Sequence, residues 1–270
     1  GWDDPRMPTI SGLRKRGYTP ESLKNFALTV GVSKRENVID ASLLEFCIRT
    51  HLNQVAPRAM AVLDPIKIKL INYENESGEK INFDINPQEK ELGTREINFS
   101  KELYIENEDF QENPVDGFFR LSLGEEVRLK NAYIIKAVDV VKDEKGKVKE
   151  VLCEYDSKSR SGSNTPESNR KVKGTIHWVS ATDSVKARVN IYDRLFKVED
   201  VANAEGDFKD YMNEQSLTKT SAWAEPALVS DALDMRFQFL RKGYFYQDAT
   251  STKEALIFNR TVTLKDAWAK

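Results

Sequence analysis

The chain has 270 residues, of which 40% are hydrophobic and 31% charged, a composition that can bury a core and excludes the class of disordered chains. Its 41 basic and 43 acidic side chains give a net charge of −2, so the overall charge indicates no nucleic-acid partner. The longest apolar runs are shorter than the roughly 18 residues that a membrane-spanning helix needs, so we expect no membrane partner.

The first 62 residues have the spacing of helices. Thr19 followed by Pro20 is a typical helix start, because threonine caps free amide groups and proline fits the first turn. Apolar residues then recur at helical spacing until Gly31, a typical helix end. The predicted helices span about residues 8–16, 20–30 and 40–56.

The pattern changes after Pro65, where apolar and polar residues alternate as in half-buried strands. Many short strands with irregular long connections favour antiparallel barrels over a parallel α/β sheet. Residues 157–169, rich in serine, glycine and asparagine, form a predicted loop. The predicted strands are residues 66–70, 81–85, 96–99, 103–105, 118–123, 172–179, 187–195, 236–247 and 255–264, together with a hairpin of 132–141 and 148–155.

Few residues of the chain suit catalysis or metal binding. Cys47 and Cys153 do not form a disulfide framework, and we interpret them as reduced, buried thiols of a cytosolic protein. The two histidines, His51 and His177, fit packing positions better than ligand positions. No phosphate-binding loop, nucleophile elbow or zinc-binding His-Glu-x-x-His motif occurs. The sequence therefore predicts no catalytic residue and no metal site.

Several planar polar side chains stand beside aromatic residues in predicted strands. Arg120 follows two phenylalanines, Arg128 and Lys130 share one face of a strand, and Gln238 lies between two phenylalanines shortly before Arg241. Such a face can stack on unpaired bases and hydrogen-bond to their edges. Alternating charge on the outside of a barrel is also ordinary, so both interpretations stay open from these residues alone.

The chain starts at Gly1 without a methionine or a signal peptide. Two explanations stay open: the chain is an excised piece of a longer protein, or its start was processed or trimmed.

Six stretches of the chain resemble one family in the same order along the sequence. They are GWDDPRMPTISGLRKRGYTP at residues 1–20, APRAMAV at 56–62, GEEVRLKNAY at 124–133, KGTIHWVS at 173–180, YDRLF at 192–196 and FNRTV at 258–262. The family is that of the glutaminyl-tRNA synthetases in their bacterial, two-barrel form. Glutamyl enzymes share GWDDPR, whereas MPTISG at 7–12 and GYT at 17–19 are more similar to the glutaminyl version.

The resemblance implies a C-terminal fragment with a mainly β fold, an N-terminal α-helical subdomain at 1–62 and two antiparallel β-barrels at 63–270. The distal barrel, roughly 110–180, is expected as an insertion in a proximal barrel of 63–109 and 181–270. The parent enzyme attaches glutamine to its tRNA with ATP and Mg. The fragment lacks that catalytic domain and is expected to hold no cofactor and to be inactive by itself.

The resemblance also assigns anticodon contacts residue by residue. Arg58 and Gln238 match side chains at the central base, Arg120 matches the reader of the third base, a guanine, and Arg128 matches a contact to the first base. Lys130 stands where the family often has a second arginine, so a planar fork is replaced by a point charge. Phe119 and Gly117 also depart from the family pattern. Further tRNA contacts are expected at Ser33, Lys34, Arg35, Arg241 and Lys265.

The expected partners are therefore a glutamine tRNA, through its anticodon loop and inner face, and the catalytic domain of the same protein. We expect a cytoplasmic monomer. Two alternatives stay open: the same module of a glutamyl-tRNA synthetase, and a protein-interaction barrel without an RNA function.

Overall fold

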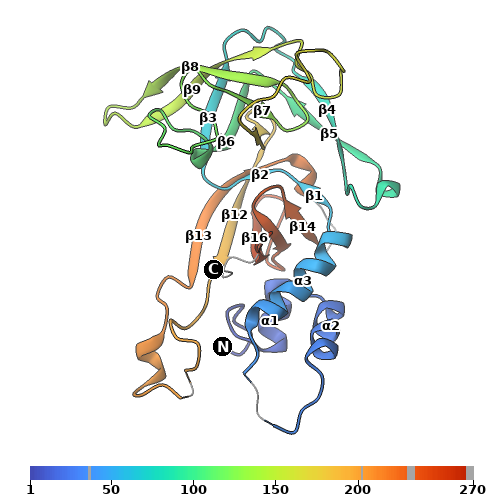
Figure 1. Ribbon diagram of the computed structural model, residues 1–270, viewed down its shortest axis with the longest axis vertical. Helices are drawn as coiled ribbons and strands as arrows, with labels where there is room; N and C mark the ends of the chain where they lie inside the picture. The colour runs from blue at the N-terminus through green and yellow to red at the C-terminus, as the bar shows by residue number, and fades with distance from the viewer. Residues whose placement is uncertain (36–37, 202, 230–234, 266–270) are drawn as a thin grey trace. The chain divides into compact units, whose positions relative to one another are not determined.

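The computed structural model of the chain describes residues 1–35, 38–201, 203–229 and 235–265 (Figure 1). Its three α-helices confirm the N-terminal prediction: α1 is Ile10–Arg16, α2 is Pro20–Val30 and α3 is Ala41–Val55. Each helix is capped by the side chain before it, because Thr9, Thr19 and Asp40 accept hydrogen bonds from first-turn amides. Gly17 ends α1 at a φ of 105°, a conformation that glycine adopts readily.

The first large sheet has seven strands. Their order is β1 (Arg58–Ala59), β14 (Arg236–Phe239), β15 (Gly243–Gln247), β16 (Leu256–Val262), β12 (Val185–Tyr192), β13 (Leu217–Ala224) and β2 (Ala61–Val62). The predicted single strand 236–247 is wrong, because a tight turn with Arg241 at a φ of 68° separates β14 from β15. Strand β13 was not predicted, since polar residues fill half of it.

The second large sheet also has seven strands. Their order is β10 (Thr175–Ile176), β7 (Glu126–Leu129), β8 (Ile134–Lys142), β9 (Val148–Asp156), β3 (Pro65–Leu70), β6 (Glu102–Glu106) and β11 (Val179–Ser180). Only His177 and Trp178 separate the two edge strands along the chain, so the sheet curls until its edges approach each other. Trp178 is fully buried, and its ring meets Phe99 edge-on at a centroid distance of 5.2 Å.

Two details of this sheet differ from the sequence prediction. The pairs β10–β7 and β3–β9 are parallel, because long excursions of the chain separate their members. Residues 118–123 form no strand and make only isolated bridges through Leu121 and Leu123. A separate antiparallel pair joins β4 (Glu79–Asp84) to β5 (Thr94–Phe99). The fold is mainly β with N-terminal helices, a nearly closed barrel and a half-barrel, which confirms the predicted fold class.

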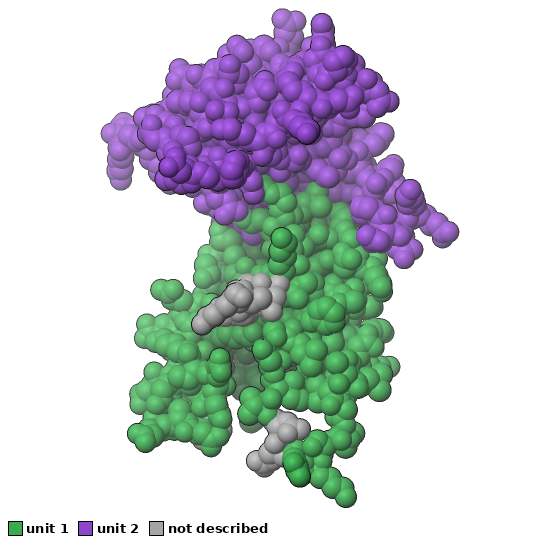
Figure 2. Space-filling model, in the orientation of Figure 1, with its two compact units in different colours: residues 1–58, 188–220, 230–270 green, residues 59–187, 221–229 purple. Residues whose placement is uncertain are grey.

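The chain forms two compact units, coloured separately in Figure 2. Unit 1 consists of residues 1–58, 188–220 and 230–270, and unit 2 of residues 59–187 and 221–229. The division into a helical subdomain at 1–62 and two nested barrels stays a prediction.

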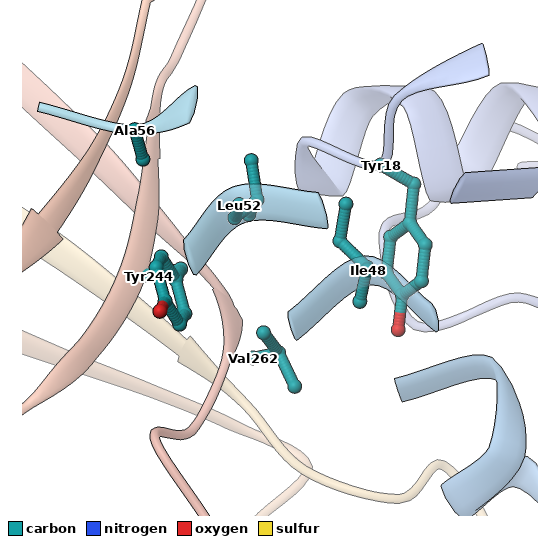
Figure 3. Packing of buried hydrophobic residues seen from close by; sticks show 6 residues of the cluster. All are labelled: Tyr18, Ile48, Leu52, Ala56, Tyr244 and Val262. Atoms are coloured by element: carbon teal, nitrogen blue, oxygen red, sulfur yellow. The ribbon is translucent and has the colours of Figure 1, made fainter. Parts of the chain in front are cut away.

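The core of unit 1 joins the helices to the sheet. Tyr18, Ile48 and Leu52 pack with Tyr244 and Val262, so α3 lies against β15 and β16 (Figure 3). This packing fixes the C-terminal end of α3, which leads directly into strand β1. The last turn of the helix therefore has a defined position next to β1.

The cysteines and histidines have the packing roles that the sequence indicates. Cys47 and Cys153 are both buried and free. His51 Nδ1 lies 2.9 Å from Thr19 Oγ1. In unit 2, buried His177 places Nε2 3.1 Å from the Ala61 carbonyl oxygen. None of the helices within the described ranges combines the length and hydrophobicity needed to cross a membrane.

Candidate nucleic-acid interface

Arg58 is a buried cation held by neutral oxygens. Pro57 ends α3 and places Arg58 at the start of β1, where the side chain is only 7% exposed. Nη1 donates to the Ala56 carbonyl at 2.8 Å, and Nη2 donates to the backbone and side-chain oxygens of Asn53 at 2.8 and 3.1 Å. Burial lowers the pKa of Arg58, but an arginine stays charged at neutral pH. Among the described residues, no carboxylate forms an ion pair with it.

Gln238 lies beside Arg58 on the neighbouring strand. The backbone N–H of Gln238 donates to the Pro57 carbonyl at 2.8 Å, and the cross-strand neighbour of Gln238 is Tyr244. The Tyr244 hydroxyl donates at 3.2 Å to Asn53 Oδ1, the same atom that receives Arg58. Gln238 Oε1 is buried and has no hydrogen-bond partner within the described part of the chain. The structure thus places a buried planar donor and an unmatched planar acceptor on adjacent strands of unit 1.

The sequence missed two supporting residues of this cluster, Asn53 and Tyr244. An asparagine in the last turn of a helix before a proline is a weak signal, since such residues are common at helix ends. From the sequence, Tyr244 is expected to be a core residue, and its ring does pack in the hydrophobic core. Only the pairing of β14 with β15 shows that its hydroxyl reaches Asn53.

Arg120 lies in a loop, not in the predicted strand. Its Nε donates to Asp109 Oδ1 at 3.1 Å, and its Nη1 donates to the Phe119 carbonyl at 3.1 Å. The Asp109 side chain is 1% exposed, whereas the Arg120 side chain is 40% exposed. No partner of Nη2 occurs among the described residues. The buried carboxylate therefore orients a guanidinium that still presents donors outward.

Arg128 is held by a distant segment of unit 2. It stands on β7, where Val127 and Leu129 are buried and Arg128 takes the opposite face. Nη1 donates to the Ser159 carbonyl at 3.0 Å and to Ser161 Oγ at 3.3 Å, and Nη2 donates to the Ser168 carbonyl at 2.6 Å. Burial and the nearby charge of Arg170 lower the pKa of Arg128.

The segment that holds Arg128 is itself anchored by two arginines. Arg160 forms an ion pair with Glu79 at 2.7 Å. Arg170 bridges Glu126 at 3.1 Å and Asp156 at 3.0 Å. The sequence treated residues 157–169 as a plain loop and missed both anchors. Two arginines near the ends of a serine- and glycine-rich stretch were the available signal.

Gly174 joins the surroundings of Arg120 to those of Arg128. Its carbonyl accepts a hydrogen bond from the Arg128 amide at 2.9 Å. A Cβ at position 174 would lie 2.9 Å from the Phe119 carbonyl oxygen, so only glycine allows this approach. Lys130 follows β7 as an exposed residue, and its carbonyl accepts from Trp178 Nε1 at 3.0 Å. The structure therefore gathers Arg120, Arg128 and Lys130 in one part of unit 2.

The remaining predicted contacts lie on further segments of unit 1. Ser33, Lys34 and Arg35 are exposed after α2, and the Arg35 amide donates to Ser33 Oγ at 3.0 Å. Arg241 occupies the turn between β14 and β15. Lys265 is exposed beyond β16. Their tRNA contacts stay predictions.

The arrangement suits recognition of unpaired bases more than catalysis. Guanidinium and carboxamide groups on fixed backbone can meet the edges of bases through paired hydrogen bonds. Within the described ranges, no group of three or more histidine, cysteine, aspartate or glutamate side chains could hold a metal ion.

Comparison with known proteins identifies the same regions. A family described as "tRNA synthetases class I (E and Q), anti-codon binding domain" matches residues 56–156, and a second family with the same description matches residues 175–248. Glutamine–tRNA ligases of Rhodopirellula baltica and Vibrio vulnificus are 53% and 50% identical over 272 and 271 residues. These alignments cover 100% of this chain but 45% and 48% of the relatives, so the chain spans about half of their length.

The two family matches include Arg58, Arg120, Arg128 and Gln238, the planar side chains around which both clusters are built. The chain belongs to the anticodon-binding domains of the class I tRNA synthetases for glutamate and glutamine.

Proposed function

We propose that this chain reads the anticodon of a glutamine tRNA as part of a glutamine–tRNA ligase. The observation that carries the proposal is the pair formed by Arg58 and Gln238. Arg58 on β1 has a buried guanidinium without a carboxylate partner among the described residues, and Gln238 on the neighbouring strand β14 has a buried carboxamide oxygen that lacks a donor there. Anticodon bases are unpaired, so they can be splayed apart and hydrogen-bonded along their edges.

Each reader has a proposed base. Arg58 and Gln238 contact the central base, Arg120 contacts the third base, and Arg128 contacts the first, where Lys130 supplies a point charge and does not discriminate between bases. The third base of glutamine anticodons is guanine, whose two acceptors match one guanidinium, a pairing worth about 1–3 kcal/mol against a wrong base. Scattered lysines such as Lys34 contact phosphates, which positions the RNA without reading it.

The full activity is proposed from the relatives, because the chain covers only about half of them. The parent enzyme attaches glutamine to its tRNA with ATP and Mg, and this chain alone is inactive. Its partners are the glutamine tRNA and the catalytic domain of the same protein, and the protein acts as a cytoplasmic monomer.

Arg120 variants test the assignment. Arg120→Lys keeps a positive charge for buried Asp109 but removes the planar fork, so the chain should fold while its preference for guanine at the third base falls by about 1–3 kcal/mol. The measurement is binding of this chain to glutamine tRNA transcripts that differ only at the third anticodon base. An equal loss of affinity for every third base would show that Arg120 supplies charge alone.

A second candidate is the same module of a glutamate–tRNA ligase, because the matching family description covers both amino acids. The wild-type chain separates the two in the same assay: a preference for guanine at the third base supports the glutamine assignment. A failure to bind any tRNA at low salt would instead favour a protein-interaction barrel.

A further inference from the structure

Unit 1 contains a cavity that the anticodon contacts do not use. Its volume is about 350 Å³, within the range of small-ligand sites. Residues from α1, from the start of α3, from the end of β16 and from the segments at 5–8 and 192–195 line it. Leu13, Leu44 and Val262 form part of an apolar wall, and four arginines also face the cavity.

Two of the four arginines are already neutralised. Arg6 forms an ion pair with Asp4 at 2.6 Å and donates to Ser216 Oγ at 2.9 Å. Arg194 lies 3.5 Å from Glu45. Asp193 also lines the cavity, so its negative charge offsets part of the positive charge of the other two arginines, Arg16 and Arg260.

Of the four lining arginines, Arg16 and Arg260 are the two without a carboxylate within 4 Å among the described residues. Arg16 Nε is buried and has no hydrogen-bond partner there, and the Arg16 guanidinium lies 5.7 Å from the Tyr192 ring centroid. Arg260 Nη2 has one long contact, 3.5 Å to the Tyr192 carbonyl. Burial and the charge of Arg16 lower the pKa of Arg260, whereas the smaller effects of Asp193 and Glu45 raise it. The guanidinium of Arg16 therefore repels that of Arg260, and the two carboxylates offset only part of this repulsion.

The backbone on both sides of this pair is fixed. Thr261 Oγ1 donates to the Arg16 carbonyl at 2.8 Å, and Asn259 Nδ2 donates to the Lys15 carbonyl at 3.2 Å. The end of α1 is therefore tied to β16, the strand that carries Arg260. The two backbone positions that carry these arginines are therefore held close to each other, and an anion between the two side chains would relieve their repulsion.

We infer that this cavity binds a phosphate-bearing group between Arg16 and Arg260. Guanidinium groups bind phosphate through short, charge-assisted hydrogen bonds. The cavity is larger than one phosphate, and its apolar wall can accept a small organic group attached to it. The phosphate comes either from a free small molecule or from an RNA backbone.

Titration of this chain with inorganic phosphate and with AMP tests the inference, using sodium chloride at equal ionic strength as the reference. Arg16→Gln and Arg260→Gln should each weaken phosphate and AMP binding about tenfold or more. Arg188→Gln makes the same change of charge at an exposed position of unit 1 and should change binding less than about twofold. Circular dichroism confirms that each variant is folded, and Arg16→Lys provides a milder change.

Unchanged phosphate binding in the folded Arg16→Gln chain would overturn the inference, as would the absence of binding by the folded wild-type chain. A competition experiment between AMP and tRNA identifies the source of the phosphate. Displacement of AMP by tRNA identifies the RNA backbone, whereas AMP binding that saturating tRNA leaves unchanged identifies a free molecule. Neither result depends on which anticodon the chain prefers, so the anticodon proposal can fail separately.

Discussion

Arg58 and Arg128 are both partly or fully buried cations held by neutral oxygens, but their supports come from different distances along the chain. The acceptors of Arg58 are Asn53 and Ala56, five and two residues away. The acceptors of Arg128 are Ser159, Ser161 and Ser168, 31 to 40 residues away. The first side chain is oriented by the helix end next to it, and the second by a loop that must first be anchored.

This difference implies that substitutions elsewhere in the chain affect the orientations of the two arginines differently. The hydrogen bonds that orient Arg58 depend only on the C-terminal end of α3, which carries their acceptors. The setting of Arg128 depends on Arg160 and Arg170, which hold the ends of the supporting loop. Substitutions far from Arg128 should therefore alter its orientation, whereas Arg58 should respond mainly to changes in its own segment.

The largest effect is expected from Arg58→Ala. The change leaves the carbonyl oxygens of Asn53 and Ala56 without their donor in a buried site, so the free energy of unfolding should fall by about 1–3 kcal/mol. Urea denaturation measures this loss. The preference for the central anticodon base should disappear in the tRNA-binding assay.

Arg58→Lys is the matched control for that change. It keeps a charge and can donate to one carbonyl, so it should be more stable than Arg58→Ala but should still lose the base preference. Full base preference in Arg58→Lys would contradict the role of the planar fork.

An intermediate effect is expected from Arg170→Ala. Its ion pairs are partly exposed, so the stability should fall by no more than about 1 kcal/mol. Release of the loop should nevertheless weaken the first-base preference severalfold, because Arg128 then loses its fixed acceptors. Competition between tRNAs with different first anticodon bases measures this preference. Lys145→Ala, at an exposed hairpin position, should leave it unchanged, and an equal effect of both substitutions would refute the anchoring role.

The smallest effect is expected from Lys130→Gln. Lys130 is exposed and acts as a point charge, so its loss should weaken binding to all tRNAs alike. The slope of the logarithm of the binding constant against the logarithm of the salt concentration should fall in magnitude by about one. Affinities measured between low and physiological salt give this slope. A change in base preference without a change in slope would assign Lys130 a reading role instead.

The sequence was a better guide to helices than to strands. All three helices follow from local signals such as Thr19 with Pro20, because caps and apolar spacing act within a few residues. The sequence did not predict strand β13, because polar residues interrupt its apolar pattern. It did not predict the turn at Arg241, because aromatic residues on both sides of the turn look like one continuous strand. The position of Arg120 in a loop was missed for the same reason.

The sequence by itself determined the chemistry of this protein: its mainly β class with N-terminal helices, and the planar polar side chains that mark its family. Tertiary structure alone decided which oxygens orient those side chains. The acceptors of Arg128 lie on a loop that no local pattern connects to β7. Hydrogen bonds between distant segments depend on how the sheets close, and sheet closure is a property of the whole fold.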